Sequence, residues 1–382
     1  MRRPIHIVLT TINVPTVVTS LLENARMHGN EESCKIWIVG DIKTPGVAAQ
    51  LAENTTTAGL ETVYLDVEAQ NQFGEKLNGF YSRLPFNNES RRNIGYLAAL
   101  DDECEVLISI DDDNFPTNQD FFGGHRQTGT TWFGDLLHEK IGYHNLCEHL
   151  VIEPARQVFP RGFPFRLRGS KNEAETLAPA GPVRIGATAG LWLLEPDVDA
   201  TTWLNGKISG TAYHGPATAV LEQSTWTPIN TQNTSVARDL IPAFLCVPMG
   251  WDVPGGKIQR YGDIWGGYFL QALMQGSEYH VAFGHPLVEH RRNPHDYLDD
   301  LRGEFWGMIL TDWLVALLRQ EFRPEGNDMT GRVEQLSEFL KGSAIRKLPK
   351  WCPAEVVGFI GWTADNLSEW ARACSQIGVQ SL

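Results

Sequence analysis

The sequence VLISIDDDN, residues 106–114, decides the fold that we expect for this chain. An apolar run rich in β-branched residues ends abruptly in three carboxylates and an asparagine. Apolar runs of this length predict a strand that is buried on both faces, as in a parallel sheet. Because open α/β sheets bind ligands at the carboxyl ends of such strands, the acidic tip Asp111–Asp113 predicts a binding site at that edge.

The acidic tip has two interpretations. Three adjacent carboxylates repel one another unless a cation or hydrogen-bond donors offset their charge. Asp111 and Asp113 point to the same side of an extended chain, and Asp-x-Asp is a metal signature of nucleotide-sugar enzymes. Mg²⁺ or Mn²⁺ prefers such oxygen ligands and often completes its shell with substrate phosphates. Alternatively, the tip is a turn whose Asp and Asn side chains bind only the local backbone.

The rest of the N-terminal half supplies the other strands of a parallel sheet. Apolar runs predict strands and helical spacing predicts helices between them, which is the βαβ pattern of a doubly wound α/β fold. Thr11 and Asp41 follow the first two strands, so they are candidates to hold a nucleobase or ribose, or else are simply turn residues. The expected strands are Ile5–Leu9, Lys35–Val39, Glu61–Leu65 and Glu105–Ile110, with helices over Val17–Met27 and Glu89–Leu100.

Composition limits the class of protein and its partners. The 382 residues are 42% hydrophobic and 20% charged, and 32 basic against 46 acidic residues give a net charge of −14. This charge argues against a nucleic-acid or anionic-membrane partner, and an anionic substrate would need a local arginine cluster or a metal. We expect a mostly parallel sheet flanked by helices over residues 1–320 and a helical C-terminal extension over 321–382. Beyond Tyr297 helices are expected to dominate, at Asp299–Gln320, Thr330–Leu340 and Pro353–Cys374.

The cysteines and the N-terminus bear on the compartment. Six cysteines lie scattered without a C-x-x-C pair, so neither a zinc site nor a disulfide framework is indicated. Arg2-Arg3 precede an apolar run that is too short for a signal peptide, and no stretch approaches the 18 or so apolar residues of a membrane span. We therefore expect a cytoplasmic protein.

Arginines alternate with aromatic residues in FPRGFPFRLRG, residues 159–169. A guanidinium gives forked hydrogen bonds to phosphate oxygens, so Arg161, Arg166 and Arg168 are candidates to bind a pyrophosphate. The alternative is a solvated loop whose arginines pair with surface acids.

Two later segments add candidate residues. In RYGDIWGG, residues 260–267, Asp263 either caps a helix or points into the cleft at a sugar, and Gly266-Gly267 indicate close approach by a ligand or another backbone. In HPLVEHRRNP, residues 285–294, His290 is either a metal ligand or a structural histidine. We assign Arg92, Asp112, Arg291 and Arg292 to nucleotide binding.

These blocks, in this order over residues 5–315, resemble the reversibly glycosylated polypeptides, the UDP-arabinopyranose mutases of plants. The similarity rests on Thr11-Ile12, Gly40-Asp41, Arg92 with Gly95-Tyr96, the acidic triplet, Arg161–Phe165, Gly190–Leu193 and Arg260–Gly267. It implies a GT-A-like fold and a metal-dependent mutase that interconverts pyranose and furanose forms of a nucleotide sugar. The acidic composition favours the branch of GDP-sugar mutases, such as GDP-fucopyranose mutases.

The resemblance also implies residue roles. Mn²⁺ or Mg²⁺ is expected at Asp111, Asp113 and His290, and would polarise the bond between the diphosphate and the anomeric carbon of a GDP- or UDP-sugar. Asp263 would position sugar hydroxyls or move a proton. Arg161 matches the family's glycosylated arginine, although a guanidinium lacks a free lone pair at neutral pH, which favours an electrostatic clamp.

Two other functions use the same residues. A retaining GT-A glycosyltransferase would pass the sugar to an acceptor, and a non-catalytic subunit would only bind the nucleotide sugar. The base, the sugar, the direction of flux and a possible homo-oligomer are left open by the sequence.

Overall fold

The computed structural model describes residues 4–77, 79–170, 173–293 and 296–380. Its centre is a mixed sheet in which four neighbouring parallel strands carry the N-terminal half, in the order β3-β2-β1-β4. Their bounds are β1 (Ile5–Thr10), β2 (Cys34–Val39), β3 (Glu61–Leu65) and β4 (Val106–Ile110). Each expected strand is present, with ends displaced by at most one residue.

The sheet continues beyond β4 through a reversed strand. β13 (Asn233–Ala237) pairs antiparallel with both β4 and β10 (Val183–Leu194), and β10 is parallel to β16 (Tyr279–His290). The α/β, mostly parallel sheet flanked by helices is therefore confirmed, while β13 was not predicted. Shorter strands extend the sheet: β5 (Asn114–Pro116), β6 (Thr131–Trp132), β8 (Leu150–Glu153), β11 (Ser209–Tyr213) and β12 (Thr218–Val220).

Successive side chains of each strand point to opposite faces of the sheet, so they pack into two separate cores. Ile5, Ile7 and Leu9 of β1 pack with α1 (Val17–His28), α2 (Val47–Thr57) and α5 (Phe121–His125) on one face. Val8 and Leu107 face the opposite side, where they join α4 (Arg92–Asp101) in the larger core. Because β4 is apolar on both faces, its chain leaves the core only at the acidic tip.

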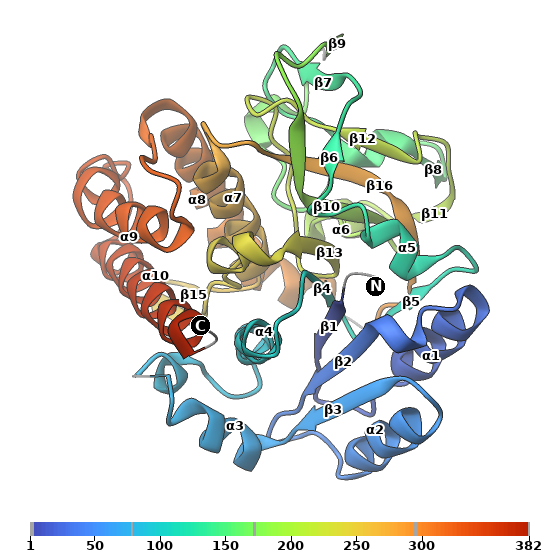
Figure 1. The fold of residues 1–382 in the computed structure, drawn as a ribbon. Coiled ribbons are helices and arrows are strands. Elements are labelled where there is room, and N and C mark those ends of the chain that lie inside the picture. Colours follow the sequence, from blue (N-terminus) through green and yellow to red (C-terminus); the bar gives the residue numbers. More distant parts are fainter. Residues whose placement is uncertain (1–3, 78, 171–172, 294–295, 381–382) are drawn as a thin grey trace.

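Helices α7 (Gly262–Met274), α8 (Tyr297–Glu321), α9 (Met329–Phe339) and α10 (Ala354–Gln380) lie together on one side of the sheet (Figure 1). The helical C-terminal segment is thus present. It shares the larger core with α4 and α7, since Trp370 packs on Phe80 at 5.2 Å between ring centroids and donates to the carbonyl of Pro242. The predicted boundary after residue 320 falls at the end of α8, without a separate core behind it.

Helix α7 lies unusually close to neighbouring backbone. A Cβ at Gly266 would lie 2.2 Å from the carbonyl oxygen of Leu245, and one at Gly267 would lie 2.1 Å from that of Ile229. The glycine pair therefore admits another stretch of backbone, not a ligand. This contact fixes the start of α7, and with it Asp263, against the segment that leads into β13.

Outside the large sheet lie two small two-stranded sheets and two further helices. The small sheets are antiparallel: β7 (Leu136–Glu139) pairs with β9 (Ala174–Leu177), and β14 (Trp251–Val253) pairs with β15 (Gly256–Ile258). The helices are α3 (Val67–Gly74) and α6 (Ala200–Leu204). None of the helices within the described ranges has the length and apolar character needed to cross a bilayer.

Candidate active site

The three carboxylates at the tip of β4 turn to three different partners. Asp111 accepts a hydrogen bond from Arg92 at 2.6 Å, Asp112 accepts one from the hydroxyl of Thr11, and Asp113 faces the imidazole of His290 at 3.5 Å. The tip is therefore more than a local turn, because each carboxylate meets a residue from a distant part of the chain. The partners come from α4, from the end of β1 and from the end of β16.

Arg92 is a buried anchor for the tip. From the first turn of α4, its guanidinium also donates to the hydroxyl of Ser109 and to the carbonyl of Thr231, both at 3.0 Å. Burial would lower the pKa of Arg92, but the charge of Asp111 outweighs it and raises that pKa. Burial raises the pKa of Asp111 even though Arg92 opposes the shift. Arg92 thus fixes the position of Asp111 through one of its two carboxylate oxygens.

His290 is oriented by the hydrogen bond of its other ring nitrogen. Its Nδ1 lies 2.6 Å from the carbonyl oxygen of Glu195, and since a carbonyl can only accept, Nδ1 must carry the proton. Nε2 is then directed at Asp113. Burial opposes charging of both groups, but their mutual attraction outweighs it: the pKa of Asp113 is lowered and that of His290 is raised.

The pair Asp113 and His290 fits a divalent cation in its chemistry. A carboxylate oxygen and an imidazole nitrogen oriented by a backbone carbonyl are donors that Mn²⁺ accepts, and that orienting bond is typical of metal-ligating histidines. The expected three-residue set is not assembled, however. Asp111 is bound by Arg92, and within the described ranges no group of three or more His, Cys, Asp or Glu is arranged to hold a metal. Remaining ligands would have to come from a diphosphate and water.

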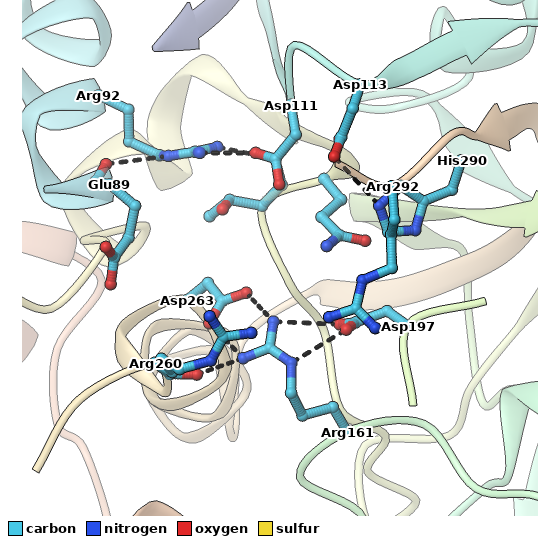
Figure 2. A pocket seen from close by; sticks show the side chains of 12 residues that line it. Glu89, Arg92, Asp111, Asp113, Arg161, Asp197, Arg260, Asp263, His290 and Arg292 are labelled. Atoms are coloured by element: carbon cyan, nitrogen blue, oxygen red, sulfur yellow. Dashed lines mark hydrogen bonds and ion pairs between the residues drawn. The ribbon is translucent and has the colours of Figure 1, made fainter. Parts of the chain in front are cut away.

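Arg161 lies between two carboxylates below the tip (Figure 2). Nε and Nη2 donate to Asp197 at 3.0 and 3.1 Å, while Nη1 and Nη2 donate to Asp263 at 3.2 and 2.6 Å. Nη1 also donates to the carbonyl of Arg260. All five N–H groups of the guanidinium are therefore engaged by the protein.

This arrangement determines the charge of the cluster. Burial would lower the pKa of Arg161, but Asp197 and Asp263 outweigh it and raise that pKa well above its usual value. Burial would raise the pKa of Asp197, but Arg161 outweighs it, and that pKa is lowered. Asp263 does not cap α7 through its side chain. It points to Arg161 instead.

Two adjoining cavities contain most of the candidate residues. A cavity of about 190 Å³ is lined by charged groups from both clusters, including Asp111, Asp113, Arg161, Asp263 and His290. A second, of about 260 Å³, contains Thr11, Asp41 and Asp112. The two share Glu89, Arg92, Asp111 and Asp113, so the acidic tip lies at their junction.

Of four further arginines that were predicted to bind the nucleotide or its diphosphate, three do not line the first cavity. Arg292 lines the first cavity, but Arg291 is exposed and pairs with Glu289. Arg166 is exposed and Arg168 pairs with Asp199 at 2.6 Å while stacking on Phe165, and neither lines the cavity. Alternation of arginine with aromatic residues here reflects local cation–π packing.

Several lining residues were not predicted as functional. Asp197 is the third residue after the end of β10, so the argument from strand ends that identified Asp111 would also have pointed to this loop. Glu89 stands at the start of the turn into α4, and Arg260 precedes α7; no local pattern marks either of them. Arg260 has a positive φ of 63°, which is uncommon outside glycine and coincides here with its carbonyl being directed at Arg161.

The family model of the reversibly glycosylated polypeptides matches residues 55–341, so the chain belongs to this family. UDP-arabinopyranose mutase 1 of Oryza sativa subsp. japonica is 24% identical over 299 residues, which cover 78% of this chain and 74% of the relative. UDP-arabinopyranose mutase 2 of Arabidopsis thaliana is 29% identical over 231 residues, covering 59% of this chain and 58% of the relative.

Two solved structures show a partial likeness at low sequence identity. Glucosyl-3-phosphoglycerate synthase from Mycobacterium tuberculosis, in complex with Mn²⁺ and UDP-glucose, has a TM-score of 0.37 at 11% identity and covers 81% of this chain and 79% of its own. S. aureus TarS in complex with UDP-GlcNAc has a TM-score of 0.45 at 10% identity, covering 91% and 76%. The match of the family model confirms, at the level of the family, the resemblance noted in the sequence.

Proposed function

We propose that this protein is a nucleotide-sugar mutase that interconverts the pyranose and furanose forms of a GDP-fucose or UDP-arabinose type of substrate. The observation that carries the proposal is Arg161, held by Asp197 and Asp263 inside the charged cavity of a member of the reversibly glycosylated polypeptide family. Relatives named UDP-arabinopyranose mutases support the reaction class.

The nucleotide would span the two cavities. The nucleoside fits the cavity that Thr11 and Asp41 line. The sugar fits the more enclosed cavity of about 190 Å³ beside Arg161, the deeper cavity of the two. The diphosphate would then lie at their junction, next to the acidic tip. Arg292 and Arg260 line the deeper cavity and can donate to phosphate oxygens there, whereas Arg161 has no N–H left to donate.

Asp113 and His290 would hold Mn²⁺ or Mg²⁺, which when bound neutralises charge on the departing diphosphate. Asp111 would keep the tip in place through the hydrogen bond that it accepts from Arg92. At the acidic tip, the protein would hold the released diphosphate close enough to bond again to the sugar.

Arg161 would carry the sugar while its ring is rebuilt. Nη2 bonds to the anomeric carbon C1 as the C1–O bond to the β-phosphate breaks, and the electron pair of that bond leaves with the diphosphate. The Nη2 proton passes to Asp263, whose carboxylate already accepts from Nη2 at 2.6 Å. Because the two aspartates raise the pKa of Arg161, the proton leaves only as the new bond forms. Return of the diphosphate reverses each transfer.

A panel of UDP- and GDP-sugars with Mn²⁺ and no acceptor tests the function, with products separated by chromatography and identified by NMR. The proposal requires a new ring isomer of one substrate. Hydrolysis alone would favour the glycosyltransferase, and metal-dependent binding without turnover over the whole panel would favour a non-catalytic subunit.

The carrier role of Arg161 has its own measurement. Intact-protein mass spectrometry should detect one added glycosyl unit after incubation with the active nucleotide sugar, and peptide mapping should place it on Arg161. A protein without the mass increment, together with an Arg161→Lys variant that still turns over, would refute the covalent step.

A further inference from the structure

Glu89 occupies the junction of the two cavities. It begins the short turn Glu89–Arg91 that leads into α4, and its side chain lines both cavities together with Arg92, Asp111 and Asp113. Figure 2 shows its side chain extending from the α4 side toward the part of the cavity where Asp263 and Arg260 lie. A sugar in the deeper cavity would therefore meet this carboxyl group.

Glu89 differs from the other acidic residues of the deeper cavity in having no side-chain partner. Asp111 binds Arg92, Asp113 faces His290, and Asp197 and Asp263 both hold Arg161. In the part of the chain that the structure describes, the Glu89 carboxylate hydrogen-bonds only to its own backbone N–H. Each of these aspartates neutralises the positive charge of its partner, whereas Glu89 is available to exchange a proton.

The surroundings of Glu89 favour the protonated form of its carboxyl group. Burial raises the pKa of the Glu89 carboxyl, its own N–H lowers it, the negative charge of Asp263 raises it, and the positive charges of Arg92 and Arg260 lower it; the net shift is upward. The thiol of Cys246, which lies behind these groups, has a pKa raised well above its usual value by burial and stays uncharged. A carboxyl with a raised pKa can act as both acid and base.

We propose that Glu89 is the proton shuttle of the ring exchange, an inference that rests on the mutase function proposed above. In ring opening, Nη2 of glycosylated Arg161 gives its remaining proton to Asp197, to which it donates at 3.1 Å. The freed electron pair forms a double bond to C1, the C1–O5 bond breaks, and O5 takes the proton of Glu89. In ring closure, the Glu89 carboxylate takes the proton of the 4-hydroxyl, O4 bonds to C1, the double-bond pair returns to nitrogen, and Asp197 returns its proton to Nη2. One proton is given and one is taken back, so the residue ends as it began.

Positional isotope exchange separates this role from the other steps. A nucleotide sugar that carries ¹⁸O in the bridge between C1 and the β-phosphate scrambles that label whenever the C1–O bond breaks and re-forms, whether or not the ring changes size. Three proteins are compared at equal concentration: wild type, Glu89→Gln, and the matched surface control Glu75→Gln. Formation of the ring isomer is followed in parallel, and thermal unfolding checks that each variant is folded.

We expect Glu89→Gln to lower kcat for ring exchange by a factor of about 10²–10⁴, with KM changed only a few-fold, because general acid–base catalysis contributes on that order. Isotope scrambling should persist in this variant. Glu75→Gln should match the wild type in both. Glu89→Asp should retain part of the ring exchange, and Glu89→Ala with added formate should regain some of it.

Distinct outcomes overturn distinct steps. Ring exchange by Glu89→Gln at more than a third of the wild-type rate would refute the shuttle and leave the mutase function intact. Parallel loss of scrambling and of nucleotide-sugar binding in a folded Glu89→Gln protein would assign Glu89 to binding, and so also refute the shuttle. A wild-type protein that forms no ring isomer from any substrate would refute the mutase function, and the shuttle with it.

Discussion

Replacing Arg161 with alanine should leave two buried carboxylates without their counter-ion. Asp197 and Asp263 are each only 7% exposed, and Arg161 is their shared counter-ion through four hydrogen bonds. Removing one partner of a buried ion pair costs about 3–5 kcal/mol, mostly because the remaining charge is left uncompensated. We therefore expect Arg161→Ala to be folded but clearly destabilised at pH 7.5.

The size of the thermal shift follows from the length of the chain. An unfolding entropy of about 2.1 cal/mol/K per residue gives about 0.8 kcal/mol/K for 382 residues, so the melting temperature should fall by about 4–6 °C. The matched control is Arg156→Ala. Within the described residues, Arg156 donates only to the backbone carbonyls of Thr202, Asn205 and Gly206, so its removal leaves no carboxylate without a counter-ion. Differential scanning calorimetry measures both variants.

The pH dependence of the stability loss distinguishes an uncompensated buried charge from lost packing as its cause. In the wild type the pKa of Asp197 is lowered in the folded state, so its contribution to stability is present above its unfolded pKa of about 3.9 and is lost as pH falls through the folded value. Without Arg161 the burial of Asp197 instead raises that pKa, so folding of the variant is opposed as pH rises. The deficit of Arg161→Ala should thus grow from pH 5 to pH 7.5.

A triple variant, Arg161→Met with Asp197→Asn and Asp263→Asn, removes the charges together and should recover most of the lost stability. If Arg161→Ala melts within 1 °C of the wild type at pH 7.5, or if its deficit is the same at both pH values, the reasoning about the buried cluster is wrong.

Two further predictions concern helix packing and the candidate metal site. Gly267→Ala should destabilise the protein by about 1–3 kcal/mol in urea unfolding, because its Cβ would meet the rigid carbonyl of Ile229 at 2.1 Å. The control is Gly361→Ala in α10, whose Cβ would meet nothing within 4 Å and which should be neutral or stabilising. Equal effects of the two substitutions on stability would contradict the close approach at Gly267. His290→Ala should weaken Mn²⁺-dependent binding of the nucleotide sugar by a factor of about 10–100 in calorimetry. His28→Ala, at a half-buried histidine that does not line the cavity, is the control, and an unchanged Kd of His290→Ala would exclude His290 as a ligand.

Local sequence patterns determined the first half of the sheet and its polar edge. Strands that are buried on both faces are continuous apolar runs, and residues that follow them lie at one edge by the geometry of a parallel sheet. This was sufficient to predict β1 to β4, to place Thr11, Asp41 and the acidic tip together, and to identify the family from its motifs.

The tertiary structure alone decided which charges meet. Asp197 and Asp263 reach Arg161 across 36 and 102 residues of sequence, and Arg92 holds Asp111. Periodicity and turn chemistry describe neighbours in sequence, so they carry no information about pairings at such separations. The reversed strand β13 escaped prediction because its sequence, NTSVA, is not an apolar run, and its polar side chains are buried only through partners elsewhere in the chain: Ser235 and Asn233 both hydrogen-bond to His125.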